Sequence, residues 1–292
     1  MSPDDYCQEK TARSGSSFYH SFRFLPPLKR RAITALYAFC REVDDVVDEN
    51  LDPEVASTAL NEWRQEITRL FHGSPEHPVT QALQPLLADF DLPEEHFLEI
   101  IDGMEMDLDK VHYENFAQLS LYCYRVASVV GLMAAEIFGY QDRRTLKYAH
   151  DLGIAFQLTN ILRDVREDAR RGRCYLPADE MMQHGVSCED INQGCMHAGM
   201  KRLLALQAER AQSYYDKAFS ELPEQDRRAQ RSGIVMAEIY HHLLERIIEQ
   251  NYPVLRKRVS LPTWQKLWLA WRCVWRENKR ARQLAQSPSR SS

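Results

Sequence analysis

Apolar residues recur along this chain at intervals of three and four positions, the pattern of helices that bury one face. The period-two alternation of half-buried strands is nowhere sustained. Proline- and glycine-containing breaks divide the pattern, but no break is long or polar enough for a domain linker. The helices that we expect are 28–49, 53–72, 79–90, 94–110, 116–139, 142–169, 197–221, 225–252 and 261–277.

These elements predict an all-α protein with one helical-bundle domain over residues 1–277, followed by a polar tail, 278–292, that we expect to be disordered. The helices between 116 and 169 are the most apolar, so we expect them at the centre of the bundle. The stretch from Val126 to Tyr140 contains Ser128, Gly131 and Glu136, so we interpret it as a buried helix and not as a membrane span.

Two of the expected helices carry a polar stripe that ends in a pair of aspartates one turn apart. Spacings of three and four positions bring these polar side chains onto one face, while the opposite face is apolar. A helix that is buried on its other faces cannot leave charges unpaired in the core, so the two stripes should line a shared cavity. The first stripe contains Tyr37, Arg41, Asp44, Asp45 and Asp48, and the second contains Gln157, Asn160, Asp164 and Asp168.

The carboxylates of the two stripes would form an oxygen-rich site, which suits Mg²⁺ when substrate phosphates complete its coordination shell. A single D-D-x-x-D segment is more typical of a solvated acidic face, but two matching pairs favour metal binding. Arg41, Arg163 and Arg166 lie among these acids, and we expect their guanidinium groups to contact diphosphate oxygens. Asp107 and Asp109 leave two interpretations open: support of this site from behind, or a solvated cluster at a helix end.

Composition and charge exclude several classes of protein. The net charge is −5 and the sequence pI is about 6.1, so the basic excess of a nucleic-acid-binding surface is absent. The seven cysteines are scattered and contain no C-x-x-C, which indicates reduced thiols and argues against a disulfide framework or a zinc site. The N-terminal segment "MSPDDYCQEK" lacks the apolar region of a signal peptide. We therefore expect a cytoplasmic protein.

The last expected helix, 261–277, carries four tryptophans on one face with basic residues beside them. One interpretation is that this helix packs onto the body of the protein. The other is peripheral contact with the inner face of a membrane, because tryptophan and basic side chains suit the headgroup region. The residues concerned are Trp264, Trp268, Trp271 and Trp275, with Lys266, Arg272 and Arg276.

Three segments resemble the squalene/phytoene synthase family of head-to-head prenyltransferases. They are "YAFCREVDDVVDE" (37–49), "YCYRVASVVG" (122–131) and "NILRDVREDARRGRCYLP" (160–177), and the resemblance extends over about residues 6–270. Ser128 stands where the family usually has glycine, and because serine is also small we expect close helix packing there. Within the family, residues 14–49 are most similar to the bacterial presqualene diphosphate synthases of hopanoid biosynthesis.

This resemblance implies an isoprenoid-synthase-type bundle with a central cavity, and about two or three bound Mg²⁺ ions. The implied metal-binding residues are Asp44, Asp45, Asp48, Asn160, Asp164 and Asp168. The implied catalytic residues are Tyr37, Arg41, Tyr122, Arg163 and Tyr175. The implied substrate-binding residues are Ser17, Phe18, Arg41, Gln157, Asn160, Arg163, Arg166 and Tyr240.

The implied reaction joins two molecules of farnesyl diphosphate into presqualene diphosphate, and other enzymes of the hopanoid pathway are the implied partners. The chain has no Gly-x-Gly, and a reaction that stops at the cyclopropane needs no reductant, so we do not expect NADPH to bind. The alternatives are a phytoene, dehydrosqualene or NADPH-dependent squalene synthase with the same site. A more distant alternative is a non-catalytic assembly protein of the same fold.

Overall fold

The computed structural model describes residues 1–13, 22, 25–49, 52–109 and 112–286, and this part of the chain is helical and contains no β-strand, as expected for an all-α protein. The helices are α1 (Pro3–Arg13), α3 (Pro27–Glu49), α4 (Pro53–Phe71), α5 (Pro78–Leu83), α6 (Glu94–Asp109), α7 (Phe116–Cys123), α8 (Val129–Phe138), α9 (Arg144–Arg170), α10 (Ala178–Gln183), α11 (Cys188–Gln193), α12 (Ala198–Glu221), α13 (Arg231–Glu249) and α14 (Thr263–Gln286). Short 3-10 turns lie at η1 (Gln84–Leu86), η3 (Glu224–Asp226) and η4 (Pro253–Leu255), and a π-helical turn, η2 (Tyr124–Ser128), joins α7 to α8.

Most of the expected helices begin and end within a few residues of their predicted positions. Among the described residues, three helices were not predicted: α1, and the short α10 and α11, which each have six residues and too few apolar positions to show a period. The segments 79–90 and 225–252 are less regular than expected, because α5 gives way to the 3-10 turn η1 and because η3 precedes α13.

The predicted boundary between the bundle and the C-terminal tail is wrong. Residues 278–286 belong to α14 and are not part of a disordered tail. The helix continues past residue 277 because two of its side chains there are anchored to the body. Arg227 forms an ion pair with the buried Glu277, and Arg280 forms one with Glu224 at the turn before α13. The last six residues of the expected tail, 287–292, lie outside the described residues.

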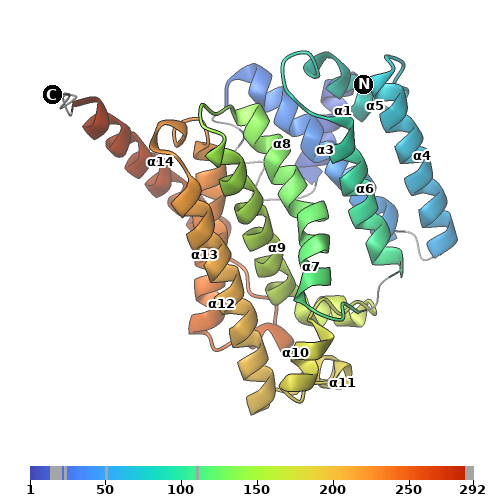
Figure 1. The fold of residues 1–292 in the computed structure, drawn as a ribbon, viewed down its shortest axis with the longest axis vertical. Coiled ribbons are helices and arrows are strands. Elements are labelled where there is room, and N and C mark those ends of the chain that lie inside the picture. The colour runs from blue at the N-terminus through green and yellow to red at the C-terminus, as the bar shows by residue number, and fades with distance from the viewer. Residues whose placement is uncertain (14–21, 23–24, 50–51, 110–111, 287–292) are drawn as a thin grey trace.

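The helices pack into one bundle (Figure 1), and its buried side chains form two clusters, both of which contribute residues to the lining of one cavity. The first cluster joins α1, α3, α4, α5 and α6 with one face of α8, and the second joins α7, α9, α12, α13 and α14. Helix α9 belongs to the second cluster, in which it packs along α12, and it also contacts α8, which contributes one face to the first cluster. This arrangement confirms the expected central position of the helices from 116 to 169.

Helix α9 crosses the segment η2–α8 at very short range. A Cβ atom on Gly153 would lie 2.6 Å from the Cα of Ser128, and one on Gly131 would lie 2.7 Å from the carbonyl oxygen of Ala149. Ser128 is fully buried, and its hydroxyl donates to the carbonyl oxygen of His150 at 2.7 Å. The serine therefore preserves the close packing that was expected. The stretch 116–138 is long and apolar enough to cross a membrane, but in this structure it forms part of the core.

Candidate active site

The two aspartate stripes face one another across the end of the bundle. Asp44, Asp45 and Asp48 lie in the second half of α3, and Asp164 and Asp168 lie in the second half of α9. Two arginines that follow α9 bridge the gap: Arg173 Nη1 lies 2.8 Å from Asp48 Oδ1, and Arg171 Nη1 lies 3.1 Å from Asp48 Oδ2. The ends of α3 and α9 therefore lie close together, and Asp107 interacts electrostatically with Asp44 and Asp48 of the first stripe and with Asp168 of the second.

Asp107 of α6 adds a further carboxylate between the two stripes. Its oxygens accept hydrogen bonds from Tyr175 at 2.7 Å and from Tyr122 at 3.0 Å. The rings of these two tyrosines stack at 5.1 Å between centroids, so each hydroxyl is held in place by both packing and a hydrogen bond. Of the two interpretations of Asp107, the structure supports a place in the site. The side chain of Asp109 is outside the described part.

The carboxyls of this site have unusual acidities. Burial, opposed by Arg41 and reinforced by the neighbouring acids, raises the pKa of Asp44 to about 6. Burial, together with Asp164 and Asp107, raises the pKa of Asp168 to about 7. Burial also raises the pKa of Asp107 to about 6, against the hydrogen bonds of its two tyrosines. Carboxylates that are costly to ionise together indicate a place for a bound cation.

Asn160 gives an independent test of whether these residues suit Mg²⁺. Its Oδ1 is buried and has no hydrogen-bond partner within the described structure, although such oxygens are normally paired. An amide oxygen and several carboxylates are hard oxygen donors, which Mg²⁺ prefers. The donor set therefore fits magnesium, with Asn160 and the aspartates of the two stripes as the residues that would hold it.

Arginines surround the same carboxylates. The guanidinium group of Arg41 pairs with Asp44 and, at 2.5 Å, with Asp45. Asp164 accepts from Arg163 Nε at 2.8 Å and from Arg258 Nε at 2.9 Å. Planar guanidinium groups beside a magnesium site are well suited to binding a diphosphate.

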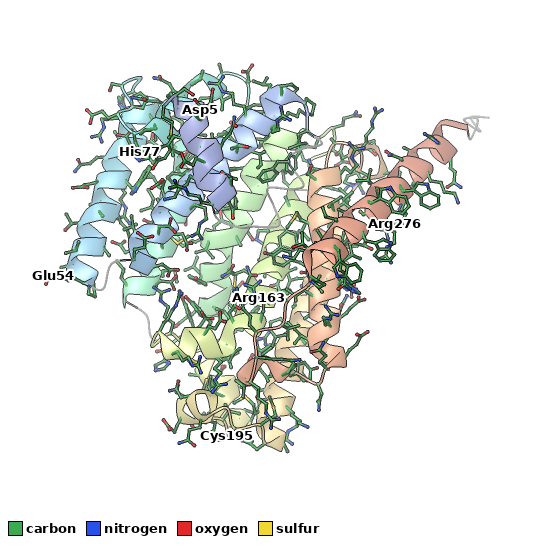
Figure 2. The ribbon with its side chains drawn as sticks, turned by 180° about the vertical axis from the view of Figure 1, so that it is seen from behind. Asp5, Glu54, His77, Arg163, Cys195 and Arg276 are labelled. Atoms are coloured by element: carbon green, nitrogen blue, oxygen red, sulfur yellow. The ribbon has the colours of Figure 1, made fainter. Side chains whose placement is uncertain are left out.

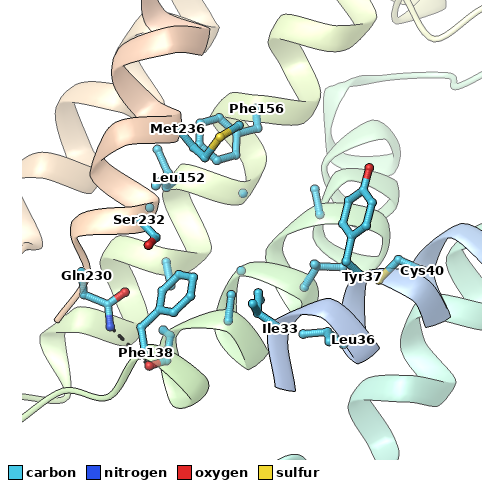
Figure 3. Close-up of a pocket in the computed structure, with 18 of the residues that line it drawn as sticks. Ile33, Leu36, Tyr37, Cys40, Phe138, Leu152, Phe156, Gln230, Ser232 and Met236 are labelled. Carbon is cyan, nitrogen blue, oxygen red and sulfur yellow. Dashed lines mark hydrogen bonds between the residues drawn. The ribbon is translucent and has the colours of Figure 1, made fainter. Parts of the chain in front are cut away.

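The carboxylates of Asp44, Asp48, Asp107, Asp164 and Asp168, with the arginines paired to them, form what we call the polar ring. Next to it lies an apolar cavity of about 220 Å³ (Figure 3). It extends between α3, η2–α8, α9 and α13, from a polar end that includes Tyr37 and Asn160 to a floor at Phe138 and Gln230. Gln230 Nε2 donates to the carbonyl oxygens of Gly139 and Ala135, so the amide nitrogen at the floor has its hydrogen-bond partners within the protein. Along α9 the cavity runs from Tyr148 to Asn160, about 18 Å at the helical rise. The side chains labelled in Figure 3 are Ile33, Leu36, Tyr37, Cys40, Phe138, Leu152, Phe156, Gln230, Ser232 and Met236.

The predicted site residues meet in one place, with a few exceptions. Tyr37, Gln157, Asn160 and Tyr240 line the cavity, while Tyr122 and Tyr175 lie beside it around Asp107. Arg163 is hydrogen-bonded to Tyr240 as well as to Asp164. Ser17 and Phe18 lie outside the described residues.

The structure places Arg166 differently from the sequence-based expectation. Its Nη1 donates to the carbonyl oxygen of Arg256 at 3.4 Å, and its guanidinium group lies beside Gly194 at the end of α11. Arg166 is two residues from Asp164, and two residues of an α-helix turn the side chain to nearly the opposite face. The expectation that Arg166 contacts diphosphate is therefore wrong for this structure.

Four residues of the site were missed or left undecided from the sequence. Arg171 and Arg173 lie within a motif but carried no periodic signal, and Asp107 was not separated from a solvated cluster. Arg258 comes from the segment after η4, far along the chain, and no local pattern indicated it.

Comparison with known proteins identifies the family. Residues 11–265 match the family model "Squalene/phytoene synthase". A 15-cis-phytoene synthase from Synechococcus elongatus is 37% identical over 276 residues, with 89% of each chain covered. A presqualene diphosphate synthase from Sinorhizobium fredii is 35% identical over 257 residues, with 88% of this chain and 92% of that protein covered.

Solved structures agree with this assignment. A dehydrosqualene synthase superposes with a TM-score of 0.84 at 28% identity, covering 95% of this chain and 97% of that chain. The squalene synthase HpnC from Alicyclobacillus acidocaldarius superposes with a TM-score of 0.74 at 30% identity, covering 86% and 94%. The fold and the sequence both match this family, and the polar ring beside an apolar cavity is consistent with it. The chain belongs to the squalene/phytoene synthase family of prenyltransferase-type enzymes.

Proposed function

We propose that this enzyme condenses two molecules of farnesyl diphosphate to presqualene diphosphate, with release of diphosphate, in a Mg²⁺-dependent step of squalene and hopanoid biosynthesis. The observation that carries the proposal is that the apolar cavity reaches Tyr240, which is hydrogen-bonded to Arg163 of the ring of carboxylates and arginines. A prenyl diphosphate has the same two parts in one molecule. Its chain suits the cavity, and its diphosphate suits the ring.

Mg²⁺, when bound, would neutralise the leaving diphosphate and favour its departure. Arg41, Arg163 and Arg258 hold the diphosphate oxygens with their guanidinium groups and orient the ester carbon toward the cavity. The apolar walls keep water from the allylic cation. The aromatic rings of Phe156 and Tyr240 lie along the cavity, where a π face stabilises positive charge without reacting with it.

The second farnesyl diphosphate supplies the electron pair of its C2–C3 double bond to the allylic carbon. A new carbon–carbon bond forms, and loss of one proton closes the cyclopropane ring. Burial and the carboxylate of Asp107 raise the pKa of both Tyr122 and Tyr175, so these hydroxyls stay protonated and act as donors. The departed diphosphate is therefore the proton acceptor in this proposal.

Two observations favour presqualene diphosphate over phytoene as the product. The ring of Phe138 and the hydrogen-bonded Gln230 occupy the floor of the cavity, and this bulk favours the shorter of the two prenyl chains. The segments resembling presqualene diphosphate synthases, and the relative of that name from Sinorhizobium fredii, agree. Phytoene synthases are the second candidate, because several of the similar proteins carry that name.

The test is incubation of the purified protein and Mg²⁺ with farnesyl or geranylgeranyl diphosphate, each with and without NADPH, followed by chromatography of the products. We expect presqualene diphosphate from farnesyl diphosphate and no change on adding NADPH. Prephytoene diphosphate or phytoene from the longer substrate would establish the second candidate, and squalene formed only with NADPH would establish a squalene synthase. If no prenyl diphosphate yields diphosphate, the protein is a non-catalytic member of the family. Asp44→Asn is the matched inactive control.

We also propose that α14 contacts the inner face of a membrane, near which a product with long apolar chains and other hopanoid-pathway enzymes would be found. Trp264 and Trp271 are 70% and 65% exposed, and Leu267 between them is 52% exposed. Arg272 lies over the ring of Trp268 at 4.6 Å, so cations and indoles share this surface. Figure 2 shows the C-terminal part of α14, beyond the labelled Arg276, projecting from the bundle.

A further inference from the structure

A second group of metal-binding side chains lies behind the active site, and it contains no acids. A ring nitrogen of His112 and the sulfurs of Cys174 and Cys188 all lie within 4.8 Å of one another. The three residues come from different segments: the link between α6 and α7, the segment after α9, and the first turn of α11. No short spacing joins them, which is why the scattered cysteines gave no indication of a metal site in the sequence.

The backbone holds two of these residues together. His112 and Cys174 form an isolated parallel β-bridge, so their positions do not depend on side-chain rotamers alone. Cys188 is placed at the start of α11 by the capping box of Ser187 and Asp190. His112 is exposed, while Cys174 is buried and Cys188 partly buried, so the group is open to solvent on the histidine side.

The chemistry of these donors selects a particular class of cation. Thiolate and imidazole are the usual zinc ligands, whereas Mg²⁺ prefers oxygen. Around a tetrahedral zinc ion, two sulfurs or a sulfur and a nitrogen are separated by roughly 3.5–3.8 Å, given the usual bond lengths. The three donor atoms need only small side-chain rotations to reach such separations. The thioether of Met181, 3.6 Å from the sulfur of Cys174, makes the surroundings still more sulfur-rich.

We propose that His112, Cys174 and Cys188 form a binding site for a thiophilic divalent cation, with Zn²⁺ as the representative ion. Three protein ligands leave a fourth tetrahedral position for water on the exposed side of His112. This site is separate from the carboxylate ring, from which it differs in donor type and in the cation that it selects.

The position of Cys174 connects this site with the active site. Its two neighbours in the chain are Arg173, which pairs with Asp48, and Tyr175, which donates to Asp107. Both reach into the active site, while the side chain of Cys174 lies against Cys188 and Met181. A cation bound at Cys174 would therefore restrict the same three-residue segment that presents Arg173 and Tyr175, so we expect its binding to raise thermal stability.

The test is a titration of the full-length, reduced protein with Co²⁺, which reports thiolate ligation by its absorption, and then with Zn²⁺ against a chromophoric chelator. Excess Mg²⁺ is present throughout to occupy the oxygen-rich site. We expect one Co²⁺ per chain with a sulfur-to-metal charge-transfer band that Zn²⁺ abolishes. Cys174→Ser and Cys188→Ser should each weaken binding by more than about tenfold, since even the loss of an indirect partner of a metal ligand has that effect.

Cys195→Ser is the matched control, because Cys195 is also partly buried, near the end of α11, and belongs to no such group. Absence of the charge-transfer band in the unmodified protein would overturn the proposal. So would equal binding by all three cysteine variants and the unmodified protein. His112→Asn removes one ligand and leaves both thiols in place, so it tests the site even if a cysteine variant does not fold. It should weaken Zn²⁺ binding in the same way. Because the measurement is metal binding and not turnover, its failure would leave the proposed prenyl transfer untouched.

Discussion

At the scale of single residues, three packed tyrosines beside Asp107 allow a test of which hydroxyl groups contribute to activity. Tyr122 and Tyr175 donate to Asp107, while the hydroxyl of Tyr113, stacked on Tyr175, is buried without a partner in the described structure. A hydrogen bond to a charged acceptor contributes about 1.5–3 kcal/mol, so Tyr122→Phe and Tyr175→Phe should each lower kcat/KM by about 10- to 100-fold. Steady-state kinetics with farnesyl diphosphate measures this loss.

Tyr113→Phe is the matched control for these variants, because it removes only an unpaired hydroxyl from the same stack. Its kcat/KM should equal that of the unmodified enzyme. If the three variants lost activity equally, the stack would matter through packing alone, and the hydrogen bonds to Asp107 would have no separate role.

The same carboxyls predict how stability depends on pH. The pKa of Asp44, Asp107 and Asp168 is about 6, 6 and 7 in the folded chain, above the ordinary value of 3.8. The folded state therefore binds more protons than the unfolded state between about pH 4 and pH 7. The stability that these groups contribute is fully present below the lower limit and is lost as the pH rises through the folded pKa values.

Without Mg²⁺, the melting temperature should therefore fall between pH 5 and pH 7.5, and added Mg²⁺ should raise it more at pH 7.5 than at pH 5, because the ion binds ionised carboxylates. Differential scanning calorimetry measures both effects. Asp168→Asn should flatten the slope obtained without Mg²⁺. A Mg²⁺ effect independent of pH would contradict the assignment of these carboxyls to the metal site.

Local sequence patterns predicted part of this site, and the reason is geometric. Asp44 and Asp48, like Asp164 and Asp168, lie one turn apart on a helix, so their shared face can be read from their spacing alone. The role of Asp107 depends on tyrosines from two other segments, and that of Arg258 on a contact with Asp164 across the fold. No spacing within one helix contains that information. The position of Arg166, in contrast, follows from spacing, because two residues of helix turn its side chain away from that of Asp164.

At the scale of helices, the crossing of α9 with η2 holds the cavity wall in place. A π-helical turn occupies the middle of the segment 116–138, where the sequence predicted an uninterrupted helix. Such turns are common at functional sites. Here the turn brings Ser128 against Gly153, where only a residue without a side chain fits. The spacing of apolar residues predicted a helix in this segment. It does not reveal a π-helical turn, because one local change of hydrogen-bond register barely alters that spacing.

Gly153→Ala should force these two elements apart. The added Cβ would approach the Cα of Ser128 to 2.6 Å, and backbone atoms cannot rotate out of the way as a side chain can. Overpacking of this kind costs about 1–3 kcal/mol of unfolding free energy. Urea denaturation followed by circular dichroism measures the loss. An unchanged midpoint would show that α9 and η2 are further apart than described.

Ser128→Ala is the milder counterpart at the same crossing. It keeps the helices in contact but removes the hydrogen bond to the carbonyl oxygen of His150, so we expect a loss of about 1 kcal/mol. A larger loss for Ser128→Ala than for Gly153→Ala would mean that the hydrogen bond, and not the close approach, stabilises the crossing.

At the scale of the whole molecule, charge and exposed aromatic residues are unevenly distributed. The chain carries a net charge of −5, yet α14 is strongly basic, and its only acid, Glu277, is buried in an ion pair with Arg227. Four of the five tryptophans of the chain lie exposed on this helix. A basic helix with exposed indoles on an otherwise acidic protein is complementary to an anionic lipid surface.

We therefore predict that the protein floats with vesicles containing phosphatidylglycerol in a density gradient, and less so at high salt, because the electrostatic part of the attraction is screened. Replacing Trp264 and Trp271 together by serine should abolish flotation, since both indoles would lose their place among the headgroups. Replacing Leu121 and Met182, which are 47% and 79% exposed elsewhere on the surface, should leave flotation unchanged. If the tryptophan variant instead changes the oligomeric state in lipid-free solution while flotation persists, α14 is an interface between copies of this chain and the membrane proposal is wrong.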